Sequence, residues 1–253
     1  MSLLGNLFSQ SRSFRELENP NVMILCAGKN SRVGSPSRES LPKSLFEVSE
    51  SPPKTVLGRA LTALKEEGLN NITVVVPDFD HPEYIPKRKR LVEFLENNKA
   101  GEGVKVFGVD FPFRDTEVLW TFMSCRSHFN NTFVLLGDVV FAKDTLKEIL
   151  DEPFKDLMFI GTYTGEKPEI YGLLMNPLGV ARIYELGNPF RNRVSPETRW
   201  EIGKMWSLYW GIGPEASKPE TWAKLFLPKN FISDIDYEYE YERVRKTIKA
   251  WKM

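Results

Sequence analysis

Two polar segments of the sequence carry residues that suit a phosphorylated ligand. The first follows an apolar run and reads Ala-Gly-Lys-Asn-Ser-Arg-Val-Gly over residues 27–34, and Leu-Pro-Lys-Ser follows at residues 41–44. Glycines allow the backbone to approach a polyphosphate, exposed amides donate hydrogen bonds to its oxygens, and Arg32 and Lys43 supply positive charge. The segment has neither the Gly-Lys-Ser/Thr of a P-loop nor a Gly-x-Gly-x-x-Gly fingerprint. Its composition therefore fits an ordinary polar loop as well as a phosphate-binding one.

Three aspartates could bind a metal ion. Asp138 ends the segment Leu-Gly-Asp, directly after the apolar run at residues 133–136. A carboxylate at such a strand end, beside a phosphate-binding loop, is well placed to hold Mg²⁺, which prefers few carboxylates together with phosphate oxygens. Asp234 and Asp236 precede the last helical segment, and either could be the second ligand. A structural role competes in each case, because Asp138 could cap a turn and the other two could be helix N-caps.

An alternation of strands and helices positions these segments in the first half of the chain. Apolar runs predict buried strands at residues 22–26, 72–76, 104–109 and 133–136. Helices are predicted at residues 54–67 with a stop at Gly68, around residues 91–95, from a cap at Asp115 or Thr116 to Met123, and from a cap at Asp144 to Leu150. This order predicts a parallel sheet covered by helices on both faces. Ligands bind such sheets at the carboxyl ends of the strands, where we expect the loop after residue 26 and Asp138 to lie.

The pattern changes after about residue 156. Strands are predicted at residues 157–163, 170–175, 180–185 and 206–211, and helices after Pro219 and at about residues 237–249. We therefore expect a mostly parallel α/β fold whose second half adds a β-rich extension or lid, and no second independent domain.

Charge and composition exclude several classes of partner. The 253 residues include 34 basic and 34 acidic side chains, so no net field recruits nucleic acid or an anionic membrane. The basic run at residues 87–90 opens an amphipathic helix and is expected to be a solvated face. No apolar run approaches the roughly 18 residues that cross a bilayer, and the first twenty residues are too polar for a signal peptide. Cys26 and Cys125 have no Cys-x-x-Cys spacing and His81 and His128 no metal-ligand spacing, which predicts buried free thiols, a cytoplasmic location and no histidine-based zinc site.

The order of the polar motifs resembles that of a known family. Leu-Cys-Ala-Gly-Lys-Asn-Ser-Arg, Leu-Pro-Lys-Ser-Leu and Leu-Gly-Asp are similar to the Ala-Ala-Gly-x-Gly-x-Arg-Met-Gly, Pro-Lys and Gly-Asp of nucleotidyltransferases of the sugar-phosphate and molybdenum-cofactor guanylyltransferase type. Tyr171-Gly172 and residues 179–185 resemble the Tyr-Gly, Gly-Arg-Val and Glu-Lys stretch of the sugar-phosphate branch. Residues 234–240 resemble its Asp-Ile-Asp-Thr-Pro-Glu-Asp close. The likeness spans about residues 22–248.

This resemblance implies a fold and a role for each matching position. The fold would be a Rossmann-like three-layer sandwich of the GT-A type, with a leader at residues 1–20 and one domain at residues 21–253. That domain would have a nucleotide-binding half at residues 21–155 and an acceptor-binding half at residues 156–253. The implied roles are nucleotide binding for Ala27, Gly28, Asn30, Ser31, Asp115 and Thr116, catalysis for Arg32 and Lys43, and Mg²⁺ binding for Asp138 and Asp236.

Two departures from the family pattern affect these expectations. Asn30 replaces the second glycine of the loop, which is tolerable because Asn enters the left-handed region more readily than most residues. Leu186 replaces the lysine that meets the acceptor phosphate in relatives. Arg191 and Arg193 follow closely and are predicted to bind that phosphate, with Lys204 as the rival; an idle position on a solvent-facing loop explains both arginines equally well.

The sequence thus predicts Mg²⁺-dependent transfer of a nucleoside monophosphate from a nucleoside triphosphate to a small phosphorylated acceptor, with release of pyrophosphate, as in nucleotide-sugar biosynthesis. An inactive relative that senses a nucleotide sugar is one alternative, although it would have no reason to keep Arg32, Lys43, Asp138 and Asp236 together. A glycosyltransferase on the same fold is the other, but Gly137-Asp138-Val139-Val140 lacks the Asp-x-Asp that it would need. Nucleobase, acceptor and the choice between monomer and homo-oligomer stay open.

Overall fold

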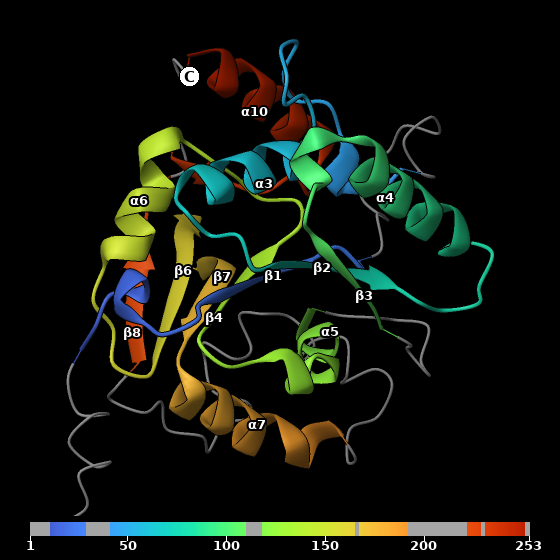
Figure 1. Cartoon of the computed structure of the whole chain (residues 1–253). Helices are drawn as coiled ribbons and strands as arrows, with labels where there is room; N and C mark the ends of the chain where they lie inside the picture. The colour runs from blue at the N-terminus through green and yellow to red at the C-terminus, as the bar shows by residue number, and fades with distance from the viewer. Residues whose placement is uncertain are drawn as a thin grey trace, which may run out of the picture.

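A computed structural model describes residues 11–28, 41–109, 118–164, 167–191, 222–228 and 231–250 of the chain, and these form a layered α/β structure around one large sheet (Figure 1). The sheet has seven strands in the order β3-β2-β1-β4-β7-β6-β8. Their bounds are Asn21–Leu25 for β1, Ile72–Pro77 for β2, Lys105–Val109 for β3, Thr132–Leu136 for β4, Leu157–Thr164 for β6, Lys167–Met175 for β7 and Trp222–Phe226 for β8. Only β7 among them runs antiparallel to its neighbours, which confirms the mostly parallel sheet.

Helices cover both faces of this sheet (Figure 1). One face carries α3 (Val56–Glu66), α4 (Ile85–Asn97) and α6 (Lys143–Asp151), and the other carries α5 (Val118–Ser124) and α7 (Pro177–Arg191). The residues of β1 alternate between the two cores: Val22 and Ile24 pack on the α3 side, and Met23 and Leu25 on the α7 side. Because both faces are covered, the strand is apolar throughout, and this is why the sequence showed continuous runs.

Helix α3 begins and ends as its sequence indicates. The side chain of Thr55 accepts a hydrogen bond from the Gly58 amide at 3.1 Å, which caps the first turn. Gly68 adopts φ of +83° just beyond the last turn, a conformation that favours glycine. The predicted helix at residues 54–67 is therefore confirmed, and it begins at Val56 and ends at Glu66.

Helix α6 is also present, but its predicted cap is wrong. The N-cap position is Ala142, which makes no side-chain cap, and Asp144 lies inside the first turn. A carboxylate in the first turn still interacts favourably with the helix dipole, so Asp144 marks the helix start without capping it. Helix α5 confirms the predicted helix at Val118–Met123, while its predicted caps, Asp115 and Thr116, lie outside the described residues.

Two predictions for the second half are wrong. Residues 180–185 were expected to form a strand but belong to α7, where Val180, Ile183 and Tyr184 pack at helical spacing against the sheet. The side chain of Asn176 accepts hydrogen bonds from the Leu178 and Gly179 amides, both at 3.0 Å, and so caps this helix. The helix expected after Pro219 is instead strand β8, which pairs in parallel with β6 at the edge of the sheet. The predicted strand at residues 206–211 lies outside the described residues.

The remaining elements join the chain ends to the body of the fold. The predicted last helix is confirmed as α10 (Glu238–Ala250), and a small antiparallel pair of β5 (Val140–Phe141) and β9 (Ile232–Ser233) precedes it. Tyr241, Val244 and Ile248 of α10 pack on apolar residues of the segment before α3. Near the other end of the chain, Phe14 is fully buried in the 3-10 turn η1 (Phe14–Glu16) and packs edge-on against Phe133, so residues before β1 contribute to the core.

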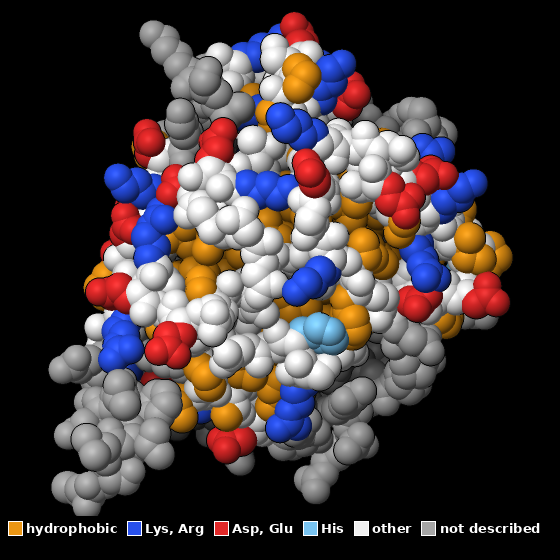
Figure 2. Space-filling view, viewed as in Figure 1, with side chains coloured by type: hydrophobic (Ala, Val, Ile, Leu, Met, Phe, Trp, Pro, Cys, Tyr) orange, Lys and Arg blue, Asp and Glu red, His pale blue; other side chains and the backbone are white. Residues whose placement is uncertain are grey.

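The described surface matches the balanced composition. On the face shown in Figure 2, basic and acidic side chains are interspersed, and no field of one sign covers it. None of the helices in the described ranges combines the length and apolarity needed to cross a bilayer.

Candidate active site

The carboxyl ends of β1 and β4 lie side by side, as expected for neighbouring parallel strands. The Gly137 amide donates a hydrogen bond to the Leu25 carbonyl at 3.0 Å. A Cβ atom on Gly137 would lie 2.5 Å from the Cys26 sulfur and 2.8 Å from the Leu25 oxygen, so this close approach requires glycine. Around Gly28, by contrast, an added Cβ would meet no atom of the described residues within 4 Å, its chain neighbours aside. The structure therefore brings Ala27 and Gly28 to the same edge as Asp138.

Lys43 contacts one carboxylate at this edge and a second one just before α10. It opens the 3-10 turn η2 (Lys43–Leu45), which is closed by hydrogen bonds from the Leu45 amide to Pro42 and from the Phe46 amide to Lys43. The Lys43 ammonium lies 3.3 Å from Asp138 Oδ2 and 2.5 Å from Asp236 Oδ1. Only 10% of the lysine side chain is exposed, so both contacts lie in a partly water-excluded site. Asp138 and Asp236 stand 95 and 193 positions after Lys43 in the sequence. Together the three residues form one charged group, the Lys43 cluster.

The charge of Lys43 depends on these two carboxylates. Burial by itself lowers the pKa of a lysine, because it penalises the charged form. Here the charges and hydrogen bonds of Asp138 and Asp236 outweigh burial, and the pKa of Lys43 is raised above its ordinary value. Lys43 is therefore a permanent cation in this setting.

Asp236 is positioned by the start of α10. Glu240 accepts hydrogen bonds from the backbone amides of Asp236 and Tyr237, at 2.9 and 3.0 Å, and thereby caps the helix from inside its first turn. Ile235, the residue before Asp236, is buried and anchors this part of the backbone. A glutamate thus satisfies these two amides, and the Asp236 carboxylate contacts Lys43.

Asp234 has a different environment from Asp236. Its Oδ1 atom is buried and has no hydrogen-bond partner within the described parts of the chain. Burial first, and then the charges of Asp138, Asp236, Glu169 and Glu240, raise the pKa of Asp234 well above its ordinary value. The sequence left open whether Asp234 or Asp236 is the second metal ligand. Of these two, Asp236 is the one that contacts Lys43 together with Asp138.

Glu169 and Glu240 belong to this acidic group and were not identified from the sequence. Glu169 accepts a hydrogen bond from the Tyr171 hydroxyl at 2.9 Å. It stands in the segment Lys-Pro-Glu, which is typical of a turn and signals no site. Glu240 could have been found, because a glutamate in the first turn of a predicted helix is a capping signal.

The acidic residues do not form a complete metal site by themselves. Within the described residues, no group of three or more His, Cys, Asp or Glu side chains gathers closely enough to hold an ion. The carboxylates of Asp138 and Asp236 both contact the Lys43 ammonium. Such a donor set fits Mg²⁺ if ligand phosphates and water complete the shell, which is the arrangement this ion prefers in nucleotide sites.

Several predicted site residues lie outside the described residues or on other elements. Asn30, Ser31, Arg32, Asp115, Thr116, Arg193 and Lys204 lie outside the described residues. Arg191 is the last residue of α7, on the opposite face of the sheet from the helices that pack beside Lys43 (Figure 1). Glu185 also lies on α7, so the stretch that resembles the family's Glu-Lys strand is helical here.

Comparisons with known proteins identify the class of fold. No family model and no curated protein matches the sequence. Among solved structures, a CTP:phosphocholine cytidylyltransferase from Streptococcus pneumoniae superposes with a TM-score of 0.63 at 15% identity, covering 90% of this chain and 99% of that chain. The inositol-1-phosphate CTP transferase from T. maritima gives 0.57 at 13% identity, with 90% and 96% covered. A UDP-glucose pyrophosphorylase from Acinetobacter baumanii gives 0.51 at 13% identity, with 89% and 92% covered.

These likenesses extend over nearly the whole of each structure. At such low identity they establish the fold, which is the α/β fold of nucleotidyltransferases, as the motif order predicted.

Proposed function

We propose that this protein is a nucleotidyltransferase that transfers a nucleoside monophosphate from a nucleoside triphosphate to a small phosphorylated acceptor and releases pyrophosphate. The observation that carries the proposal is the convergence of Lys43, Asp138 and Asp236 at the carboxyl edge of the sheet. The names of the similar structures support it, since they pair CTP with phosphocholine or inositol-1-phosphate, and uridine diphosphate with glucose.

In the proposed reaction an oxygen of the acceptor phosphate attacks the α-phosphorus of the triphosphate. The bond to the bridging oxygen of pyrophosphate breaks, and that oxygen takes the negative charge. Little is required of the side chains beyond alignment and electrostatic stabilisation. Lys43 would stabilise the charge that develops in the transition state, and the backbone at Ala27 and Gly28 would lie along the nucleotide.

The charge balance of the cluster favours a divalent cation. One lysine faces two carboxylates, and the charges of Glu169 and Glu240 act on nearby Asp234, while Glu240 is itself paired with Arg243 at 3.9 Å. An anionic triphosphate would be repelled from this group unless a cation accompanied it. Asp138 and Asp236 would hold Mg²⁺, which would neutralise charge on the phosphates.

The other roles carry over from the family likeness as parts of the same proposal. Asn30, Ser31, Asp115 and Thr116 would contact the nucleotide, and Arg32 would act with Lys43. Arg191 and Arg193 would bind the acceptor phosphate, with Lys204 as the rival. The buried free thiols of Cys26 and Cys125 suit a reducing compartment, so we place the reaction in the cytoplasm.

The direct test is pyrophosphate release from the four common nucleoside triphosphates against a panel of phosphorylated acceptors, with Mg²⁺ and with a chelator. We expect release for at least one pair, and its loss on chelation. Nucleotide binding without release for any pair would contradict the proposal and favour a nucleotide-sugar sensor. Transfer of sugar from a nucleotide sugar, without pyrophosphate, would favour a glycosyltransferase.

A further inference from the structure

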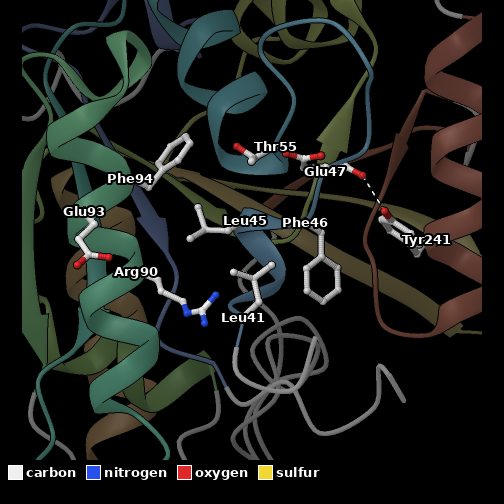
Figure 3. Close-up of a pocket in the computed structure, with 9 residues that line it drawn as sticks. All are labelled: Leu41, Leu45, Phe46, Glu47, Thr55, Arg90, Glu93, Phe94 and Tyr241. Carbon is white, nitrogen blue, oxygen red and sulfur yellow. Dashed lines mark hydrogen bonds between the residues drawn. The ribbon is translucent and has the colours of Figure 1, made fainter. Parts of the chain in front are cut away.

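A cavity of about 540 Å³ opens between α4, α10 and the segment that precedes α3. Leu41, Leu45, Phe46 and Phe94 give it apolar walls, and Thr55 and Tyr241 add two hydroxyl-bearing side chains (Figure 3). Its volume and its mostly apolar lining are typical of sites for small molecules. It is separate from the edge of the sheet where Ala27, Gly28 and Asp138 lie, because none of those residues lines it.

Arg90 supplies a positive charge at this cavity. The basic run at residues 87–90 supplies four positive charges, and three of them are paired: Lys87 with Glu83, Arg88 with Asp78, and Lys89 with Glu93. Arg90 makes no ion pair within the part of the chain that the structure describes. Its side chain extends from α4 towards Leu41 and Leu45, whereas the Glu93 carboxylate is turned away from them (Figure 3). Glu47 lies at the far end of the cavity, beside Thr55 and Tyr241.

The unpaired arginine and the apolar walls together define the chemistry of an occupant. A guanidinium binds a carboxylate, phosphate or sulfonate through two parallel hydrogen bonds. The apolar walls would cover a flat hydrocarbon or aromatic body. The fitting ligand is therefore a small molecule with an apolar body and one anionic group.

The cavity touches both segments that carry the Lys43 cluster. Leu45 ends the turn η2 that Lys43 opens, and the Phe46 amide donates to the Lys43 carbonyl at 3.0 Å. Tyr241 belongs to α10, whose first turn positions Asp236, and its hydroxyl donates to the Glu47 carbonyl at 2.7 Å. The Phe46 and Tyr241 rings also pack edge-on, 5.8 Å apart. A ligand bound between these rings and α4 would therefore change the distance between Lys43 and Asp236.

We propose that this cavity is an effector site for a small anionic amphiphile, which is held by Arg90 and lowers turnover by displacing the turn that carries Lys43. The inhibition rests on the proposed function, but binding at Arg90 does not. The two can therefore be tested separately.

Binding is tested with 8-anilinonaphthalene-1-sulfonate, whose aromatic rings and single sulfonate match the site and whose fluorescence reports its binding. We expect saturable binding, with a dissociation constant that rises about tenfold in Arg90→Ala, because a charge-assisted hydrogen bond to the anion is lost. Arg90→Lys should fall in between. The matched control is Arg88→Ala on the same helix, which should change affinity by less than about twofold because Arg88 does not line the cavity. Equal affinity in the wild type and Arg90→Ala, both folded by thermal melting, would overturn the site.

Regulation is tested by pyrophosphate release at saturating triphosphate and acceptor. The probe should lower the maximal rate of the wild type, whereas Arg90→Ala should keep its basal rate and resist the probe. Binding at Arg90 with no change in maximal rate would overturn the effector role. If the wild type releases no pyrophosphate with any substrate pair, the proposed function fails, and the probe affinities still decide whether the site exists.

Discussion

The two ends of the sheet each bury a carboxylate beside a cation, and they differ in charge balance. Asp156 precedes β6 at the amino end of that strand, is 1% exposed, and pairs with Arg182 of α7 at 3.4 Å. At the carboxyl ends of β1 and β4, Lys43 faces both Asp138 and Asp236, and further acidic groups lie close by. At the amino end one carboxylate faces one cation, whereas at the carboxyl end two carboxylates share the Lys43 ammonium within the described residues.

This difference supports the proposal that the cluster at the carboxyl end is a binding site and that the pair at the amino end is structural. The pair of Asp156 and Arg182 joins α7 to the start of β6, although neither carboxylate oxygen of Asp156 has a hydrogen-bond partner among the described residues. A cluster with unmatched charge is costly unless a ligand completes it, and perturbed groups of this kind gather at functional sites. We therefore expect substitutions at the carboxyl end to affect turnover, and those at the amino end to affect stability.

The largest effect is expected for Asp138→Asn. Removing this charge should lower turnover about 10³-fold or more, because the group that would hold the metal over the phosphates is lost. The melting temperature should change little, since the aspartate is not a core contact. The measurements are pyrophosphate release and thermal unfolding, with exposed Glu185→Gln on α7 as the matched control. Near-normal activity with Mg²⁺ would remove Asp138 from the site.

Lys43→Ala is expected to lower the single-turnover rate by about 10²-fold, and to weaken triphosphate binding much less, if the lysine acts chiefly on the transition state. Nucleotide titration alongside rapid-quench kinetics measures both. Equal losses in rate and affinity would make Lys43 a binding residue only.

A second change at the same cluster sharpens the comparison. Lys43→Ala alone leaves the carboxylates of Asp138 and Asp236 without their cation. The double variant Lys43→Ala with Asp236→Asn removes one of these two negative charges. It should therefore recover part of any stability lost in the single variant, without recovering the rate.

Asp156→Asn should give the opposite result to Asp138→Asn. Breaking its pair with Arg182 is expected to cost about 2 kcal/mol of unfolding free energy, less than for a fully buried pair because Arg182 is partly exposed. Turnover of the folded protein should be unchanged. Denaturant unfolding and pyrophosphate release at a temperature well below the transition measure the two quantities. A large fall in turnover would show that the amino end of the sheet also serves the site.

The smallest effect is expected for the double change Arg191→Ala with Arg193→Ala. If these arginines bind the acceptor phosphate, the acceptor KM should rise about tenfold while triphosphate affinity stays nearly constant. Initial rates across acceptor concentrations measure this. An unchanged acceptor KM would leave both arginines as surface residues and direct attention to Lys204.

The sequence by itself determined the class of fold and which residues follow the carboxyl ends of β1 and β4. Strands buried on both faces must be apolar throughout, so β1, β2 and β4 were legible as continuous runs. Parallel neighbours end at the same edge, so the positions of Ala27, Gly28 and Asp138 followed from the order of elements. The fold found among nucleotidyltransferases agrees with the order of the motifs.

Only the tertiary structure decided the identity of short segments in the second half. Residues 180–185 and 222–226 are brief apolar stretches that suit a helix or a strand, and their partners determined the outcome. The first packs as a helix over the sheet from a cap at Asn176, and the second pairs with β6 as an edge strand.

The tertiary structure also decided which carboxylates meet the lysine. Lys43 and Asp236 stand 193 positions apart, and no local pattern relates them. Their contact arises because α10 packs against the segment before α3 and Glu240 takes the backbone amides at the helix start. A charged contact of this kind depends on the packing of distant apolar faces, which sequence spacing does not encode.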